Sequence, residues 1–329
     1  MLTVLLATRN RARILRDVLE SYIHVQQPAS GWKLIVVDNG STDETAEVVS
    51  SFKSRLPLHY VSEPRLGKNH ALNTGLGLVE GDLLVFTDDD AFPHPDWLVE
   101  LRKAADTQLS YTIFGGVVVP RWEIPPPHWI QWIELSPVYA LTSPSLKEGP
   151  IPPLLVFGPN MAVRTRVFQS GMRLDPSIGP RGCDSPMGGE TEFLVRLSRQ
   201  GYKAWHAHEA VVEHLIREAQ LNKAWVLQRA IRYGRGNYRM LCAEGITSRK
   251  TWVGIPRRLF RDIPKEVLLM GTACLFLKRE AAFRSAWHFN FLRGQAIEDR
   301  ILSRQQRGER NRLPKQGETC GDTREPASR

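Results

Sequence analysis

The first 105 residues alternate short apolar runs with stretches of helical periodicity, and this alternation constrains the fold more than any other feature of the chain. Each apolar run is long enough for one buried strand, and each following stretch repeats its apolar residues at helical spacing. The predicted strands are Leu2–Ala7, Leu34–Val37, Leu58–Val61 and Leu83–Thr87, and the predicted helices are Ala12–Ile23, one beginning near Asp43, Lys68–Leu78 and Asp96–Ala105. This order predicts an α/β fold with a doubly wound, mostly parallel sheet, whose ligands bind at the carboxyl ends of the strands.

The chain changes character after residue 119. Residues 120–159 are rich in Pro and Trp, which predicts a long loop with a short helix near His128–Leu135. The later pattern predicts a helix at Gly189–Arg199 and two short strands at Ala204–His206 and Ala210–Val212. Two Arg-rich helices are predicted at Glu218–Cys242 and Pro264–Leu302, and a disordered tail from Ser303. Pro264 suits the first turn of its helix. We therefore expect an α/β domain over 1–216 with halves at 1–110 and 111–216, a basic helical extension over 217–302 and a tail over 303–329.

The net charge of +9 is distributed unevenly. Residues 1–216 contain 20 Lys and Arg against 24 Asp and Glu, a net charge of −4, whereas residues 217–329 carry +13. A basic segment of this size favours an anionic partner, such as nucleic acid, a membrane surface or an acidic protein. The basic residues lie beyond the predicted cleft and form no nucleic-acid recognition motif, so we do not expect nucleic acid as a partner.

One apolar run in the basic segment bears on location. Val267–Leu277 is well short of the ~20 residues that a membrane-spanning helix needs. Basic residues flank it at Arg257, Arg258, Arg261, Lys265, Lys278 and Arg279. The run predicts either peripheral contact with an anionic membrane or packing of the helices onto the domain.

The cysteines and the N-terminus indicate a compartment. Cys183, Cys242, Cys274 and Cys320 have neither CxxC nor zinc spacing, which predicts free thiols in a reducing environment. The first residues lack a basic region and a cleavage site, so a secretory signal is not expected. We therefore expect a cytoplasmic protein, peripheral on the inner face of the cell membrane if the basic helices bind lipid.

Three consecutive carboxylates, Asp88, Asp89 and Asp90, follow the fourth predicted strand. Like charges this close raise one another's pKa unless a positive charge lies nearby. A divalent cation held by carboxylates and a substrate phosphate would supply that charge, and a solvated acidic turn is the other interpretation. Asp38 ends the second strand at the same expected edge, within an Asp-Asn-Gly-Ser run that also favours a turn.

Two basic motifs are expected at this edge as well. Thr8-Arg9-Asn10-Arg11 follows the first strand, and Gly67-Lys68-Asn69 begins a helix whose backbone N–H groups could face an anion. Neither motif has the glycine spacing of a P-loop or of a dinucleotide-binding turn. A kinase-like NTPase and a nicotinamide-dependent oxidoreductase are therefore disfavoured.

Two further candidates come from the second half of the domain. Glu190 and Glu192 stand at i and i+2 of a predicted helix, so they cannot both face one cleft. Glu190 could act as a general base or serve only as a favourable charge at the helix N-terminus. His214 could contact a metal or a phosphate, or have a structural role.

Taken together and in order, these motifs resemble the inverting, nucleotide-sugar-dependent family-2 glycosyltransferases of the GT-A fold. The resemblance covers residues 1–216 and rests on Thr8–Arg11, Val37–Asp43, Gly67–Asn73, Asp88–Asp90, Gly158–Ala162, Gly189–Glu192 and Glu213–His214. It implies transfer of a sugar from a UDP-, GDP- or dTDP-sugar to a hydroxyl of a saccharide or lipid-linked acceptor, with Mg²⁺ or Mn²⁺ as cofactor. The products would be polysaccharides, glycolipids or other glycoconjugates.

The resemblance also implies roles for single residues. On the donor side the nucleoside would be held by Thr8, Arg9, Asn10 and Asp38, and Lys68 would position the donor. Asp88 would contact the ribose, with Asp89 beside it. Asp90 would bind the metal, with Asp88 and His214 as further candidate ligands. Asn160 would line the acceptor side, and Glu190 would be the general base with Glu192 as its competitor. The aromatic residues near Trp129 are expected to shape the acceptor site. Glu190 departs from the family, which usually has Asp there, and Pro159 replaces a residue that is often small.

Two other functions stay open on the sequence. A sugar-phosphate nucleotidyltransferase would use a similar sheet, but its Gly-rich basic loop after the first strand is missing. A non-enzymatic, membrane-tethered binding protein would need none of the carboxylates that this chain retains at Asp38, Asp88, Asp90 and Glu190.

Overall fold

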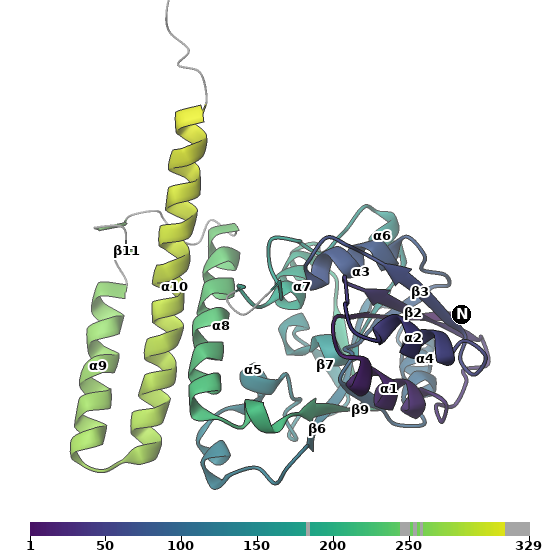
Figure 1. The fold of residues 1–329 in the computed structure, drawn as a ribbon, viewed down its shortest axis with the longest axis horizontal. Helices are drawn as coiled ribbons and strands as arrows, with labels where there is room; N and C mark the ends of the chain where they lie inside the picture. The colour runs from purple at the N-terminus through teal and green to yellow at the C-terminus, as the bar shows by residue number, and fades with distance from the viewer. Residues whose placement is uncertain (182–184, 244–250, 253–254, 257–258, 313–329) are drawn as a thin grey trace, which may run out of the picture.

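The computed structural model describes residues 1–181, 185–243, 251–252, 255–256 and 259–312. An α/β domain and a group of C-terminal helices lie side by side in it (Figure 1). The α/β domain is built on one sheet with the strand order β3-β2-β1-β4-β8-β6-β9-β5, and β7 pairs with β9.

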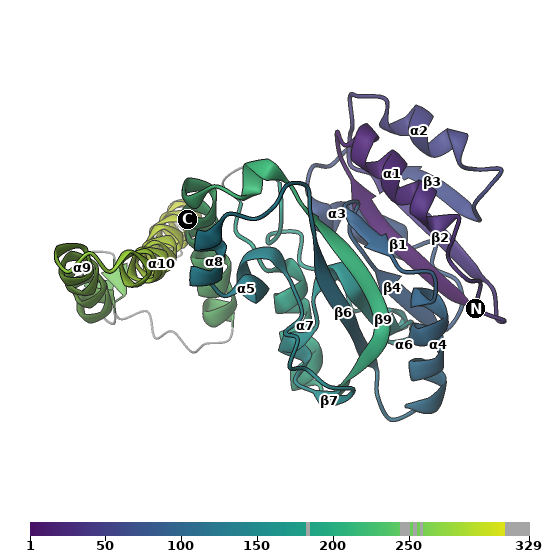
Figure 2. The same cartoon turned by 90° about the horizontal axis from the view of Figure 1, so that it is seen from below.

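The four predicted strands pair in parallel with one another and form one side of this sheet (Figure 2). They are β1 Leu2–Thr8, β2 Trp32–Asp38, β3 Leu58–Ser62 and β4 Leu83–Phe86, and the helices that follow them are α1 Ala12–Tyr22, α2 Thr45–Ser51, α3 Lys68–Leu76 and α4 Trp97–Thr107. Leu34 and Val36 of β2 face the core under α1, α2 and α4, whereas Ile35 and Val37 face the core under α3 and α7 (Gly189–Arg199). Burial on both faces is typical of parallel sheets and explains the continuous apolar runs. The predicted doubly wound, mostly parallel architecture is confirmed.

The strands after β4 make the rest of the sheet mixed. They are β5 Ala91–Pro93, β6 Ile113–Trp122, β7 Gly149–Ile151, β8 Met161–Arg164 and β9 Ala204–Ile216. The two short strands expected at Ala204–His206 and Ala210–Val212 are parts of the single strand β9. Its register with β6 shifts beside exposed His208 and Glu209. This bulge interrupts the apolar alternation, which is why the sequence predicted two strands.

Residues 120–159 hold more regular structure than the expected long loop. β6 continues to Trp122, and the segment contains the 3₁₀ helices η1, η2 and η3 and the short helix α5, at His128–Trp132, Pro153–Leu155, Gly158–Asn160 and Leu135–Tyr139. The helix expected near His128–Leu135 is therefore divided into two turns. Tyr139 anchors the second turn, since its ring is buried and stacks on Trp225.

The C-terminal region differs from the prediction in its helix boundaries. It contains η4 Glu218–Gln220, α8 Lys223–Ala243, the two-residue strands β10 Thr251–Trp252 and β11 Ile255–Pro256, α9 Leu259–Leu275 and α10 Arg279–Arg312. The single helix expected over Pro264–Leu302 is wrong, because the chain reverses at Leu277, whose φ is +54°. Pro264 lies inside α9 instead of in its first turn. The disordered tail expected from Ser303 is also wrong as far as Arg312, because α10 continues to that residue; residues 313–329 lie outside the described part.

Two expectations on location can be compared with the described residues. Cys242 and Cys274 form no disulfide with any described residue. Cys183 and Cys320 lie outside the described residues, as do Arg257 and Arg258. Within the described ranges, no helix combines the length and the apolar character needed to cross a membrane.

α8 is held between the α/β domain and α10 by close backbone contacts. Gly234 of α8 faces the carbonyl oxygen of Phe291, and Gly294 of α10 faces the carbonyl oxygen of Ile231, so that neither position has room for a Cβ atom. On a neighbouring part of the same interface, buried Glu298 accepts hydrogen bonds from two arginines of α8, Arg235 and Arg239. These contacts fix the position of α8.

Gly234→Ala should therefore destabilise the protein although alanine is the better helix former. The new methyl group overlaps the Phe291 carbonyl and forces α8 and α10 apart, at a cost of about 1–3 kcal/mol in unfolding free energy. Gly271→Ala in α9 is the matched control, because a Cβ there meets no described atom within 4 Å. Thermal melting followed by circular dichroism should show a lower midpoint for the first variant and an equal or higher one for the second. Equal midpoints for Gly234→Ala and wild type would contradict this packing.

Candidate active site

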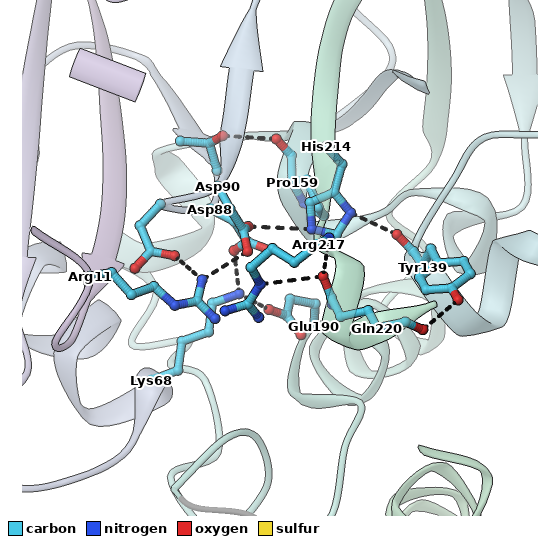
Figure 3. A network of polar contacts seen from close by, with 12 residues as sticks. Arg11, Lys68, Asp88, Asp90, Tyr139, Pro159, Glu190, His214, Arg217 and Gln220 are labelled. Carbon is cyan, nitrogen blue, oxygen red and sulfur yellow. Dashed lines mark hydrogen bonds and ion pairs between the residues drawn. The ribbon is translucent and has the colours of Figure 1, made fainter. Parts of the chain in front are cut away.

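The carboxyl ends of three adjacent parallel strands meet at one edge of the sheet. Thr8 ends β1, Asp38 ends β2, and the three aspartates Asp88–Asp90 follow β4. Glu190, in the first turn of α7, and His214, on β9, reach the same place from the second half of the chain (Figure 3). The convergence predicted from strand ends is therefore found in the structure.

The three aspartates have different partners. The Lys68 Nζ donates to Asp88 at 2.5 Å. The Thr8 hydroxyl donates to Asp89 at 2.8 Å, and one Arg11 nitrogen reaches both Asp89, at 2.6 Å, and Asp90, at 2.8 Å. The cluster is thus a set of paired carboxylates and not a solvated acidic turn.

These partners separate the acidities of neighbouring carboxyl groups. Burial raises the pKa of Asp89 to about 6, against the opposing charge of Arg11. Burial would also raise the pKa of Asp90, but the charges of His214 and Arg11 outweigh it and hold that pKa well below its usual range. Asp90 is therefore the carboxylate of this buried pair that stays ionised most firmly.

Asp88, Asp90 and His214 have the arrangement of a divalent-metal site. Each offers one ligand atom, and the three atoms lie within 4.8 Å of one another. The His214 Nδ1 lies 2.7 Å from the carbonyl oxygen of Tyr139, which can only accept, so Nδ1 carries a hydrogen and Nε2 points toward Asp90 at 3.3 Å (Figure 3). Two carboxylates and an oriented imidazole suit a divalent cation such as Mg²⁺ or Mn²⁺.

Glu190 faces this cluster across Lys68. The Lys68 Nζ lies 2.6 Å from a Glu190 oxygen and 2.5 Å from Asp88, so one ammonium group joins the two carboxylates. Burial opposes ionisation of Glu190, but Lys68 outweighs it and keeps the Glu190 pKa below its ordinary value. The Glu190 side chain packs against Gly158, where a Cβ would lie 3.0 Å from its Cγ.

Glu192 points elsewhere. Its carboxylate forms an ion pair with Arg196 one turn later, at 2.5 Å. The i, i+2 geometry therefore separates the two glutamates as predicted, and Glu190 is the one beside Lys68 and Asp88.

The residues expected at the nucleoside form a hydrogen-bonded rim. Asp38 accepts from the Tyr60 hydroxyl and the Ser41 N–H, both at 2.8 Å. Asn10 is exposed with a φ of +51° and accepts from the Thr42 N–H at 2.7 Å. Arg9 is exposed beside it.

Two expected acceptor-side residues lie elsewhere. Asn160 is fully buried, donates to the carbonyl oxygens of Val117 and Ala210 and accepts from the Trp97 Nε1. Its side chain supports the fold and does not line the cleft. Trp129 packs on Phe283 of α10, and the Nζ of Lys223 from α8 lies 5.8 Å from its ring centre, so this tryptophan joins η1 to the C-terminal helices.

Sequence reasoning missed three residues of the site. Tyr60 holds Asp38, and the signal for it was the parallel register that places β3 beside β2. Tyr139 orients His214, but its position in an irregular segment gave no signal. Arg217 lowers the pKa of Asp90, and its signal was its place three residues after His214.

A cavity of about 880 Å³ extends beside the carboxylate cluster. Asn10, Arg11, Asp43 and Arg217 line it together with residues of α1, β5 and β9. A volume of this order is common for small-molecule sites. Arg11 joins the cavity wall to the cluster through its bonds to Asp89 and Asp90, whereas Lys68, Glu190 and the three aspartates do not line the cavity.

Known proteins resemble the chain in sequence. Residues 3–169 match the family model described as Glycosyl transferase family 2. Glycosyltransferase AglE of Haloferax volcanii is 24% identical over 253 residues, which are 76% of this chain and 77% of that protein. Glucosyl-dolichyl phosphate glucuronosyltransferase of the same organism is 24% identical over 205 residues, or 61% of this chain and 65% of that protein.

Solved structures resemble the chain in fold. Mannosyltransferase PcManGT from Pyrobaculum calidifontis in complex with GDP-Man and Mn²⁺ superposes with a TM-score of 0.61 at 20% identity, over 91% of this chain and 86% of that chain. S. aureus TarS 1–349 gives a TM-score of 0.50 at 14% identity, over 93% and 91%. These likenesses confirm the predicted GT-A-type α/β fold with a helical C-terminal extension.

The family match spans half of the chain and includes Asp38, Lys68 and the Asp88–Asp90 cluster. A nucleotidyltransferase and a non-enzymatic binding protein, the two alternatives left by the sequence, are therefore not supported. This chain belongs to glycosyltransferase family 2 and is a glycosyltransferase.

Proposed function

We propose that the enzyme transfers a sugar from a nucleoside-diphosphate sugar to an acceptor hydroxyl by a metal-assisted, inverting displacement. One observation carries this proposal: the Lys68 ammonium group forms ion pairs with both Glu190 and Asp88. Glu190 is a carboxylate suited to be a base, and Asp88 belongs to the candidate metal site with Asp90 and His214. The site thus has a place for the leaving diphosphate at one end and a proton acceptor at the other, as a single displacement requires.

The donor end is assigned to the strand-end residues. Asp38 binds the nucleobase, with Thr8, Arg9 and Asn10 around the nucleoside, and Asp88 contacts the ribose. Asp90, Asp88 and His214 hold Mg²⁺ or Mn²⁺, which when bound neutralises the charge that develops on the diphosphate. GDP-Man and Mn²⁺ in the PcManGT structure, and UDP in a TarS structure of TM-score 0.50, support this donor class, within which UDP-, GDP- and dTDP-sugars are candidates.

The acceptor end is assigned to Glu190. A sugar or lipid-linked hydroxyl is a weak nucleophile until a base within hydrogen-bond reach takes its proton. The lowered pKa of Glu190 keeps it in the ionised form that this role needs. Attack from the Glu190 side, opposite the diphosphate, inverts the anomeric centre, and the products would be polysaccharides, glycolipids or other glycoconjugates.

We also propose that the enzyme is cytoplasmic and contacts a membrane, and the exposed surface of α9 supports this contact. Leu268, Leu275, Phe276 and Leu277 are 68, 82, 73 and 84% exposed, three of them at the turn between α9 and α10. The exposed basic residues around them are Arg261, Lys265, Lys278 and Arg279. We propose that this face binds the anionic inner surface of the cell membrane, where a lipid-linked acceptor would be found; the dolichyl phosphate in the name of one relative supports such an acceptor.

Glu190→Gln should remove turnover and leave donor binding intact. The amide keeps the size of the side chain but cannot accept a proton, which should lower kcat by roughly 10²–10⁴-fold. Glu192→Gln on the same helix is the matched control and should retain turnover, since Glu192 pairs with Arg196. The assay is product formation with the nucleotide sugar that binds. Full turnover by Glu190→Gln, or an inactive but folded Glu192→Gln, would place the base elsewhere.

Asp90→Ala should abolish metal-dependent donor binding. It removes the carboxylate that faces His214 and Arg11, and with it a ligand of the cation that holds the diphosphate. Titration calorimetry with UDP- and GDP-sugars, with and without Mn²⁺, measures the effect. Asp96→Ala, at an exposed aspartate outside the cluster, is the control and should bind like wild type. Equal Mn²⁺ dependence in both variants would contradict the metal assignment.

Replacing Leu275, Phe276 and Leu277 together by Ser should prevent flotation with vesicles. Wild type should float with phosphatidylglycerol vesicles and less with neutral phosphatidylcholine, because each basic residue near an anionic surface contributes about 1 kcal/mol. Leu109→Ser is the control, since Leu109 is 72% exposed on the α/β domain. Salt should release the wild type. Absence of salt-sensitive flotation would reject the membrane proposal.

A further inference from the structure

Arg229 of α8 has a guanidinium that is incompletely hydrogen-bonded among the described residues. Its Nε is buried and has no hydrogen-bond acceptor among them. The guanidinium lies 5.3 Å from the ring centre of Trp225, and burial lowers the pKa of Arg229 to about 10. A buried donor without an acceptor costs stability, so such a group needs an explanation.

The helical turn of α8 that precedes Arg229 packs beside the candidate metal site of Asp88, Asp90 and His214, so Arg229 lies near this site. Trp225, four residues earlier and on the same helix face, stacks on Tyr139 with ring centres 5.8 Å apart and planes within 7°. The carbonyl oxygen of Tyr139 in turn orients His214. Arg229 therefore lies one helical turn after Trp225, the residue through which α8 contacts Tyr139 and, through it, His214.

The turn after Arg229 places it close to the proposed base. The Arg232 Nε donates to the carbonyl oxygen of Ser185 at 3.1 Å, and the Met187 N–H donates to the Arg232 carbonyl at 3.1 Å. Residues 185–187 lead directly into α7 and its Glu190. Arg229 thus lies on the face of α8 between the His214 side and the Glu190 side of the cleft.

The charges of the cleft act on Arg229 at this position. Asp90 and Asp88 raise its pKa against burial, and Arg229 adds to the effect of Lys68 in lowering the pKa of Glu190. The carboxylates nevertheless have closer partners of their own, because Arg11 pairs with Asp90 and Lys68 pairs with both Asp88 and Glu190. Arg229 is therefore an additional positive charge that acts on the carboxylates at both ends of the site.

We propose that Arg229 binds the oxygen atoms of a phosphate group held between His214 and Glu190. A guanidinium presents parallel N–H donors to phosphate and forms charge-assisted hydrogen bonds with it. The inference rests on the proposed function, which offers two sources for this phosphate: the diphosphate of the sugar donor and the phosphate of a lipid-phosphate acceptor. Arg229 lies outside residues 3–169, so the family match does not assign it.

The test compares Arg229→Gln and Arg229→Lys with Lys223→Gln. The control removes a charge from the same helix at an exposed residue whose Nζ lies over the rings of Trp132 and Phe283. Binding is measured by titration calorimetry with UDP and GDP in the presence of Mn²⁺, and separately with octyl phosphate against octyl glucoside. We expect Arg229→Gln to weaken at least one phosphate ligand about tenfold, as expected for losing one hydrogen bond to a charged group. Arg229→Lys should recover part of the binding, and octyl glucoside should be unaffected.

The pattern of losses decides between the sources. Weaker UDP or GDP binding alone assigns Arg229 to the donor, and weaker octyl phosphate binding alone assigns it to the acceptor. A melting temperature that is unchanged or raised in Arg229→Gln supports a binding role, because a purely structural arginine would lower it. Unchanged binding of both ligand classes in Arg229→Gln, while wild type binds them, overturns this inference alone. A wild type that binds no nucleotide overturns the proposed function as well.

Discussion

The three adjacent carboxylates at the end of β4 are the constraint on which the site depends. Side by side at a buried strand end, they cannot all be ionised without positive charge close to them. The fold supplies that charge from two helix starts: Arg11 immediately precedes α1, and Lys68 is the first residue of α3. Arg11 spans Asp89 and Asp90, and Lys68 extends the pairing from Asp88 to Glu190. A helix N-terminus is itself weakly positive, so the starts of α1 and α3 also favour the ionised carboxylates, although they do not favour the Arg11 and Lys68 cations themselves. The starts of α1, α3 and α7 thus meet at the acidic cluster.

The C-terminal helices also help to position residues of the site. Tyr139 is buried between them and the sheet: its hydroxyl donates to the carbonyl oxygen of Gln220, its ring stacks on Trp225, and its own carbonyl holds His214. The orientation of the imidazole therefore depends on α8, which in turn is fixed against α10 through glycine–carbonyl contacts. The match to the family model ends at residue 169, before either glutamate of α7 and before α8. Glu190, His214 and Arg217 of the site consequently lie outside the part of the chain that the family match covers.

The sequence predicted what depends on local pattern and strand direction. The edge at which Thr8, Asp38 and Asp90 meet follows from three parallel strands, and the separation of Glu190 from Glu192 follows from helix geometry alone. What failed depends on tertiary contacts. Asn160 looks like a cleft residue in its motif, but its amide is used entirely by Trp97 and two backbone carbonyls. Nothing local distinguishes the turn at Leu277 from a continuing helix, because only the packing of α9 against α10 determines it. Arg229 was one of many arginines until its burial and its neighbours were known.

The positions of the C-terminal arginines explain the uneven charge of the chain. Within the described part of the C-terminal region, some arginines have a structural role, since Arg235 and Arg239 form ion pairs with the buried Glu298. Others lie on the exposed surface near the apolar turn of α9. Arg229 fits neither group, because its buried Nε has no acceptor among the described residues and its charge acts on Asp88, Asp90 and Glu190. A fold does not gain stability by burying such a donor, and replacing it by an apolar side chain would relieve the cost. Its burial is understandable if a ligand supplies the missing acceptor, which is the role that we propose for a substrate phosphate.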